Sequence, residues 1–168
     1  LNSPTLGLYN LSLAPADFFS QIDIIHNASG SLYSSGTPGG AINLINQPAW
    51  DNKLDITFTN QAGSFNNYYH NLSANIGNTL IQYSPSIIYH TVKNNYPYFD
   101  EIQNKQKIQQ NNQFQSLGAV NNVYIKLPNN HTIKSGLWIM SSVYEIPDIE
   151  GKTHSSNSKQ EDKTIKWY

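Results

Sequence analysis

YYHNLSANIGNTLIQYSPSIIYHTV, residues 68–92, decides the fold because it holds two alternating segments joined by a short polar turn. In residues 68–77 apolar side chains alternate with asparagine and serine, and in residues 81–92 they alternate with glutamine, serine and histidine. A period of two is typical of a β-strand with one apolar face. The stretch therefore predicts an antiparallel hairpin that turns at Gly77 to Leu80.

The register of this hairpin follows from its pattern, because a slip of one residue would move the apolar side chains of a strand to the other face. Pairing residues whose numbers sum to an odd value sets Leu72 and Ile76 against apolar residues, whereas an even sum sets them against serines. The odd register also puts His70 and His90 on opposite faces. It therefore argues against a metal site built from this pair, and we expect none from the other histidines.

Three further segments alternate in the same way, at residues 53–61, 114–127 and 131–144. Each of the five strands reaches the roughly 9 to 11 residues that a tilted strand needs to span a bilayer. Their connections differ in length: residues 77–80 and 128–130 are short, 63–67 are intermediate, and 93–113 and 145–160 are long and polar. Short turns on one side and long loops on the other are typical of outer-membrane barrels. A soluble β-sandwich has less reason to sort its loops by length.

The composition excludes several classes of protein. Only 12% of the 168 residues are charged and 12% are aromatic, with a net charge of -1. All ten basic residues are lysine, so the chain has no arginine fork and no basic surface for nucleic acid. The absence of cysteine removes disulfides, thiolate metal sites and thiol nucleophiles. We expect no cofactor and no metal, and we find neither a signal peptide nor an apolar run long enough for a spanning helix.

Catalytic patterns are also missing. The sequence has no Ser-His-Asp order, no HExxH and no phosphate-binding glycine loop, so we predict that the protein is not an enzyme. Asp100, Glu101, Asp148 and Glu150 could form carboxylate pairs, but we interpret them as solvated charges of long loops.

A motif lies upstream of the strands, at Ile24 to Asn46, where a short apolar strand leads into a glycine cluster and a second apolar strand. It resembles the end of the plug domain of TonB-dependent outer-membrane receptors. The positions at the family's spacing are Leu32, Tyr33, Gly36, Gly39, Gly40 and Asn43. The chain departs from the family where His26, Asn27 and Ala28 replace Arg-Gly-Pro, where Ser34 follows Tyr33, and at Pro38. The loss of that arginine puts in doubt an ion pair between plug and barrel wall.

The resemblance extends through the barrel part and is nearest to the cobalamin and siderophore branch of the family. It implies a mainly β chain: residues 1–48 are the C-terminal part of an α+β plug, and residues 49–168 are the first five to six antiparallel strands of a transmembrane β-barrel. The chain would then be a fragment of a receptor in the outer membrane of a Gram-negative bacterium. The implied partners are outer-membrane lipid, a metal chelate or corrinoid ligand, and the TonB energy-transducing complex, reached through a missing N-terminal segment. No nucleic acid is expected.

Aromatic clusters are the candidate ligand-binding residues, because rings supply contact area at low entropy cost. With a plug on the inner side, the long loops lie outside, and they carry the candidates Tyr96, Tyr98, Phe99, Tyr144 and His154. An alternative for such residues is an aromatic girdle at the membrane interface, which we favour for Tyr68, Tyr69 and Tyr89. Trp138 and Met140 share the face opposite the apolar one and are expected to point into the lumen.

Two other functions remain open. A passive outer-membrane porin would share the strands but would have no reason to carry the plug motif. A soluble all-β carbohydrate-binding module would use the same exposed tyrosines and asparagines.

Overall fold

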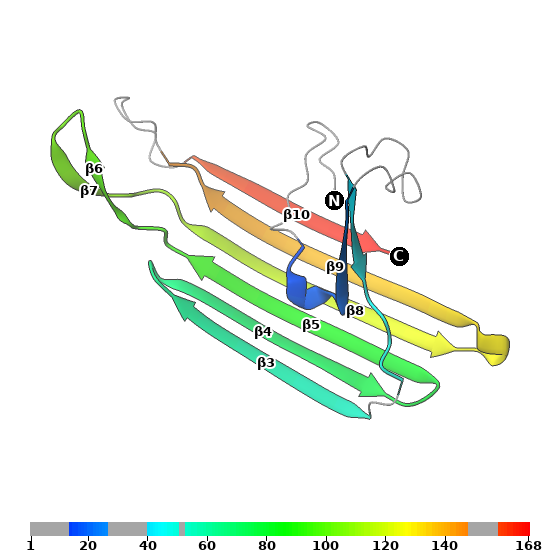
Figure 1. The fold of residues 1–168 in the computed structure, drawn as a ribbon. Helices are drawn as coiled ribbons and strands as arrows, with labels where there is room; N and C mark the ends of the chain where they lie inside the picture. The colour runs from blue at the N-terminus through cyan, green and yellow to red at the C-terminus, as the bar shows by residue number, and fades with distance from the viewer. Residues whose placement is uncertain (1–13, 27–39, 51–52, 148–157) are drawn as a thin grey trace. The chain divides into compact units, whose positions relative to one another are not determined.

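The computed structural model describes residues 14–26, 40–50, 53–147 and 158–168, and the chain divides into two compact units, residues 1–49 and 50–168. Both are built from antiparallel β-strands, which confirms the mainly β prediction (Figure 1).

In the first unit, a 3₁₀ turn, η2 (Ala16–Phe18), leads into the paired strands β1 (Gln21–His26) and β2 (Gly40–Ile45). Ser20 ties the open end of this hairpin. Its backbone N–H and its hydroxyl both donate to the Ile45 carbonyl at 3.0 Å, and its hydroxyl oxygen accepts from the Gln47 N–H at 3.0 Å. The strand ends are therefore held by one serine.

The second unit contains a six-stranded antiparallel sheet in which strands adjacent in the chain are adjacent in space. Its order is β10-β9-β8-β5-β4-β3, and its edges are formed by β3 and β10. The strands are β3 (Leu54–Gly63), β4 (Asn67–Gly77), β5 (Ile81–Val92), β8 (Phe114–Lys126), β9 (Thr132–Glu145) and β10 (Lys159–Trp167). The five complete strands predicted from alternation are confirmed within two residues at every end.

The register predicted for β4 and β5 is also confirmed. Leu72 pairs with Ile87 and Ile76 pairs with Tyr83, so the residue numbers sum to an odd value. His70 pairs with Tyr89, whereas His90 pairs with Tyr69, and the two histidines lie on opposite faces of the sheet. The serines and asparagines of both strands consequently meet one another on the second face.

Two boundaries differ from the prediction. Residues 93–113 were expected to be an irregular loop, but they contain a second, two-stranded sheet of β6 (Pro97–Asp100) and β7 (Lys105–Ile108). The loop predicted at residues 145–160 ends earlier, because Lys159 and Gln160 already belong to β10 and pair with β9. Neither segment shows an apolar alternation that would mark it as a strand, because β6 and β7 have only four residues each and β10 begins with polar and charged residues.

Turns in this protein use asparagine where the backbone becomes left-handed. Apart from Phe65, every described non-glycine residue with a positive φ is an asparagine, and these are Asn66, Asn94, Asn104, Asn111, Asn129 and Asn130. Asparagine tolerates this conformation better than other side chains with a Cβ. The turn between β4 and β5 uses asparagine differently, since the Asn78 side chain accepts the N–H groups of Leu80 and Ile81 at 2.8 and 2.9 Å. Asparagine therefore shapes both kinds of connection.

Candidate functional site

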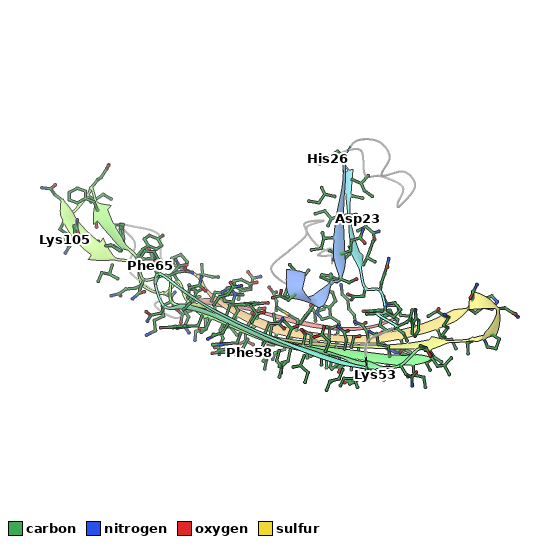
Figure 2. The ribbon with its side chains drawn as sticks, turned by 60° about the horizontal axis from the view of Figure 1, so that its bottom comes forward. Asp23, His26, Lys53, Phe58, Phe65 and Lys105 are labelled. Carbon is green, nitrogen blue, oxygen red and sulfur yellow. The ribbon has the colours of Figure 1, made fainter. Side chains whose placement is uncertain are left out.

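The six-stranded sheet has one apolar and one polar face, and Figure 2 shows side chains projecting from both. Phe58, Leu72, Ile87, Ala119, Ile139 and Ile165 form one rung of directly paired residues that is apolar on all six strands. Five of these side chains are large and exposed, from 44% for Ile139 to 75% for Ile165. In water, each half-exposed isoleucine or leucine would forgo roughly 1 kcal/mol of transfer free energy.

The neighbouring rungs extend this apolar face in both directions. Its other large exposed members are Leu54, Ile56, Tyr68, Ile76, Ile81, Tyr83, Tyr89, Leu117, Ile133, Leu137 and Trp167. Monomeric soluble proteins rarely expose contiguous apolar patches larger than a few hundred Å². We call this surface the apolar face.

Three polar side chains on the apolar face are bonded to aromatic residues of a neighbouring strand. Asn121 accepts from the Tyr83 hydroxyl at 2.5 Å, and Ser135 accepts from the Trp167 indole N–H at 3.1 Å. Nearer the long-loop end, the Gln115 amide donates to the Tyr89 hydroxyl at 3.1 Å. Such pairing reduces the cost of placing a polar group in an apolar medium.

The opposite face, here called the polar face, carries a hydrogen-bonded network between β4 and β5, in which Asn71, Gln82 and Ser86 are buried. The Ser86 hydroxyl donates to Asn71 at 2.9 Å, and the Ser84 hydroxyl donates to Asn75 at 2.7 Å. Gln82 donates to both Asn75 and Ser84 through its side-chain nitrogen. This face also buries apolar side chains, among them Ile88, Val120 and Tyr124, so its buried part is a mixture of polar and apolar residues.

Bulky side chains also occupy the polar face farther along the sheet. Trp138 and Met140 are buried at 5% and 1% exposure. Because side chains alternate along β9, they lie on the other face of the sheet from the exposed Leu137 and Ile139. Lys166 lies over the Trp138 ring at 5.7 Å, while Lys134 lies over Tyr124 and Tyr168 at 5.7 and 5.2 Å. The expected face of Trp138 and Met140 is confirmed.

A row of rings crosses the polar face at the long-loop end. His90 makes edge contacts with Tyr69 at 5.6 Å and with Phe114 at 5.2 Å, and Phe114 contacts Tyr144 at 4.8 Å. The four rings come from β4, β5, β8 and β9. We call them the aromatic row. Tyr69 was predicted to join the girdle with Tyr68 and Tyr89, and this was wrong: alternation places it with Asn71 on the polar face.

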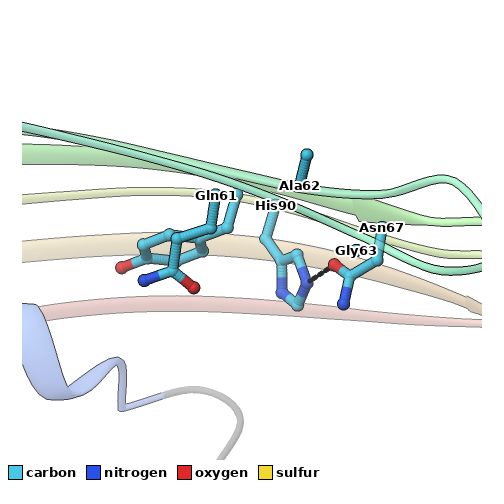
Figure 3. A pocket seen from close by; sticks show the side chains of 6 residues that line it. Gln61, Ala62, Gly63, Asn67 and His90 are labelled. Atoms are coloured by element: carbon cyan, nitrogen blue, oxygen red, sulfur yellow. Dashed lines mark hydrogen bonds between the residues drawn. The ribbon is translucent and has the colours of Figure 1, made fainter.

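A pocket of about 300 Å³ lies at one end of the aromatic row. Its lining residues are Gln61, Ala62, Gly63, Asn67, Tyr69 and His90. In Figure 3 the side chains of Gln61, His90 and Asn67 point to one side of the sheet, and Ala62 points to the other. The His90 ring nitrogen Nε2 lies 2.9 Å from the Asn67 side-chain oxygen, which fixes both side chains at the wall of the pocket. Sequence reasoning missed this site, although alternation puts Gln61, Tyr69 and His90 on one face.

The predicted ligand residues are only partly brought together. Tyr144 belongs to the aromatic row, whereas Tyr96 makes an edge contact with Phe65 at 6.0 Å. Tyr98 and Phe99 are consecutive in β6, so they lie on opposite faces of the small hairpin. His154 lies outside the described residues, as do Leu32, Tyr33, Gly36 and Gly39 of the upstream motif. Gly40 and Asn43 of that motif lie in β2, where they pair with His26 and Asp23.

Asp100 was interpreted as a solvated loop charge, and this was wrong. Its side chain is 2% exposed, forms an ion pair with Lys107, and accepts the N–H groups of Ile102 and Gln103 at 2.9 Å each. The hydrogen bond from Lys107, followed by that from Gln103, lowers the pKa of Asp100. The carboxylate therefore closes the turn of the β6–β7 hairpin.

This hairpin should lose order in acid. Because the folded-state pKa of Asp100 lies below its unfolded value, its contribution to stability is present above the unfolded pKa, about 3.9. It is lost as the pH falls through the folded pKa. We expect the hydrogen-exchange protection factors of the Ile102 and Gln103 amides, measured by NMR in detergent micelles, to fall over that range, whereas the amides of β8 serve as an internal control. Asp100→Asn should remove the pH dependence, and unchanged exchange in the native protein would contradict this role.

The comparisons with known proteins leave the fold and geometry as the main evidence. No protein-family pattern and no curated protein matches this sequence. Among the described residues, no helix has the length and apolarity to cross a membrane, and no three His, Cys, Asp or Glu side chains cluster as metal ligands would.

Proposed function

We propose that residues 50–168 form part of the wall of an outer-membrane β-barrel and that residues 1–49 are the end of its plug. The observation that carries this proposal is the apolar face, which is exposed on all six strands while the polar network is buried. Lipid is the environment in which such a distribution is favourable, because outer-membrane strands alternate apolar residues facing lipid with polar residues facing the lumen. The six strands contain 9 to 14 residues, which meets the length that a tilted spanning strand requires, roughly 9 to 11.

The two sheet edges fit the same proposal. Open strand edges do not occur in the hydrocarbon region, because their N–H and C=O groups have no water to bond there. In a barrel, β3 and β10 would each pair with a further strand. The up-and-down order of the six strands is the connectivity that outer-membrane barrels use.

The proposed activity is energy-coupled uptake of a scarce nutrient, as in TonB-dependent receptors. The ligand binds on the outer side, and an inner-membrane energy source remodels the plug so that the ligand passes inward. The support for this step is the upstream motif, whose Gly40 and Asn43 lie in a paired strand. Metal chelates and corrinoids are the ligand classes that the resemblance suggests.

Uptake by cells with and without a proton gradient tests this function. We expect cells that express the full protein to accumulate radiolabelled cyanocobalamin or ferrichrome, and a protonophore to reduce accumulation to the level of cells that lack the protein. Accumulation that continues after the gradient collapses would instead indicate a porin. Recovery of the protein in the aqueous fraction after detergent phase separation would indicate the soluble carbohydrate-binding alternative.

A further inference from the structure

We propose that the pocket at the end of the aromatic row binds a hexose ring of a neutral sugar. This inference rests on the proposed function, because the polar face must line a water-filled lumen for a sugar to reach it. It names a ligand class different from the chelates and corrinoids that the resemblance suggests.

The chemistry of the pocket lining favours an uncharged, hydroxylated ligand. Its polar side chains are Gln61, Asn67, Tyr69 and His90, and the lining has no carboxylate and no lysine. Amide, phenol and imidazole groups can both donate and accept hydrogen bonds, which suits the hydroxyl groups of a sugar. An anionic chelate would instead require cationic side chains, and bidentate recognition by arginine is impossible in this chain.

Ring geometry supplies the apolar half of sugar recognition. The His90 ring is held by the Asn67 hydrogen bond and stands edge-on to both Tyr69 and Phe114, with interplanar angles of 78° and 79°. Rings fixed by their neighbours lose little entropy on binding. Rigid aromatic surface beside amide groups offers contacts to the C–H face and the hydroxyl edge of a pyranose together.

Calorimetry on the full protein in detergent provides the test, with maltotriose and cellotriose as neutral probes and trigalacturonate as the anionic one. We expect a neutral trisaccharide to bind and Tyr69→Leu to weaken its binding about tenfold, the upper range for one aromatic contact. Tyr68→Leu is the matched control, because Tyr68 precedes Tyr69 in β4 and lies on the apolar face. It should leave the affinity unchanged.

A second variant keeps the test decisive if Tyr69→Leu does not fold. Gln61 is exposed on the edge strand β3, so Gln61→Ala should fold normally and still weaken the binding of the trisaccharide. Failure of both neutral trisaccharides to bind, binding of trigalacturonate in their place, or sugar binding that neither variant changes would overturn the inference. Energy-dependent uptake of ferrichrome or cyanocobalamin alongside such a result would leave the proposed function standing.

Discussion

Ile87→Lys is expected to destabilise the membrane-inserted protein by about 2 kcal/mol or more, because a lysine facing lipid near the centre of the apolar band costs roughly 2–4 kcal/mol. Ile87 lies on the rung that is apolar on all six strands, between Leu72 and Ala119. Its side chain is 48% exposed, so the new lysine would meet the surrounding medium rather than a packed core. Whether the medium around residue 87 is lipid or water therefore decides the size of the effect.

Reversible unfolding in urea with lipid vesicles measures this effect. Thr57→Lys is the matched control, since Thr57 is exposed and lies on the polar face of β3, opposite Ser73. We expect it to change the free energy of unfolding by less than about 0.5 kcal/mol, as is usual for exposed substitutions. If Ile87→Lys were equally harmless, the apolar face would be in contact with water, and the barrel proposal would be wrong.

Gly77→Ala is expected to destabilise the β4–β5 hairpin by about 1–3 kcal/mol, the range for forced overpacking. A Cβ atom at this position would lie within van der Waals overlap of backbone atoms, 2.3 Å from the Ile81 carbonyl oxygen and 2.8 Å from the Gln82 Cα. Backbone atoms cannot rotate away as a flexible side chain could. The turn must therefore open, which strains the two hydrogen bonds that Asn78 accepts.

Gly63→Ala is the control for this second substitution. Gly63 ends β3 as Gly77 ends β4, but a Cβ atom there would meet only the Asn67 side chain at 3.5 Å or more. We expect it to leave the urea midpoint almost unchanged. If both substitutions lowered the urea midpoint equally, the cause would be the lost backbone flexibility of glycine. The close approach of a Cβ atom at residue 77 to Ile81 would then not explain the effect.

The central strands were predictable because their apolar residues recur with a period of two. Leu72, Ile76 and Ile87 indicate the hairpin and the face on which its strands pair, since a slip of one residue would set apolar residues against the face that carries Ser84 and Ser86. The β6–β7 hairpin was not predictable in this way. It depends on an ion pair and two hydrogen bonds made by Asp100, and a polar segment carries no periodic signal of such contacts.

The candidate site, too, was only partly predictable from the sequence. Tyr144 was found from sequence because aromatic residues cluster near a predicted loop, but its partner Phe114 is 30 positions away and becomes a neighbour only through the pairing of β8 with β9. The pocket at Gln61, Asn67 and His90 requires three strands in a defined register. A search for aromatic residues in predicted loops could therefore not have found this pocket.

The sequence by itself determined the local order of the large sheet: the positions of its five complete strands, where the short turns fall, and which face of each of these strands is apolar. These properties depend on side-chain alternation and turn chemistry within a few residues. Only the tertiary structure decided that apolar residues from all six strands form one exposed surface and that the rings of Tyr69, His90, Phe114 and Tyr144 form one row. The physical reason is that hydrogen-bonded pairing places residues from distant segments within about 5 Å of one another, a distance that local sequence does not encode.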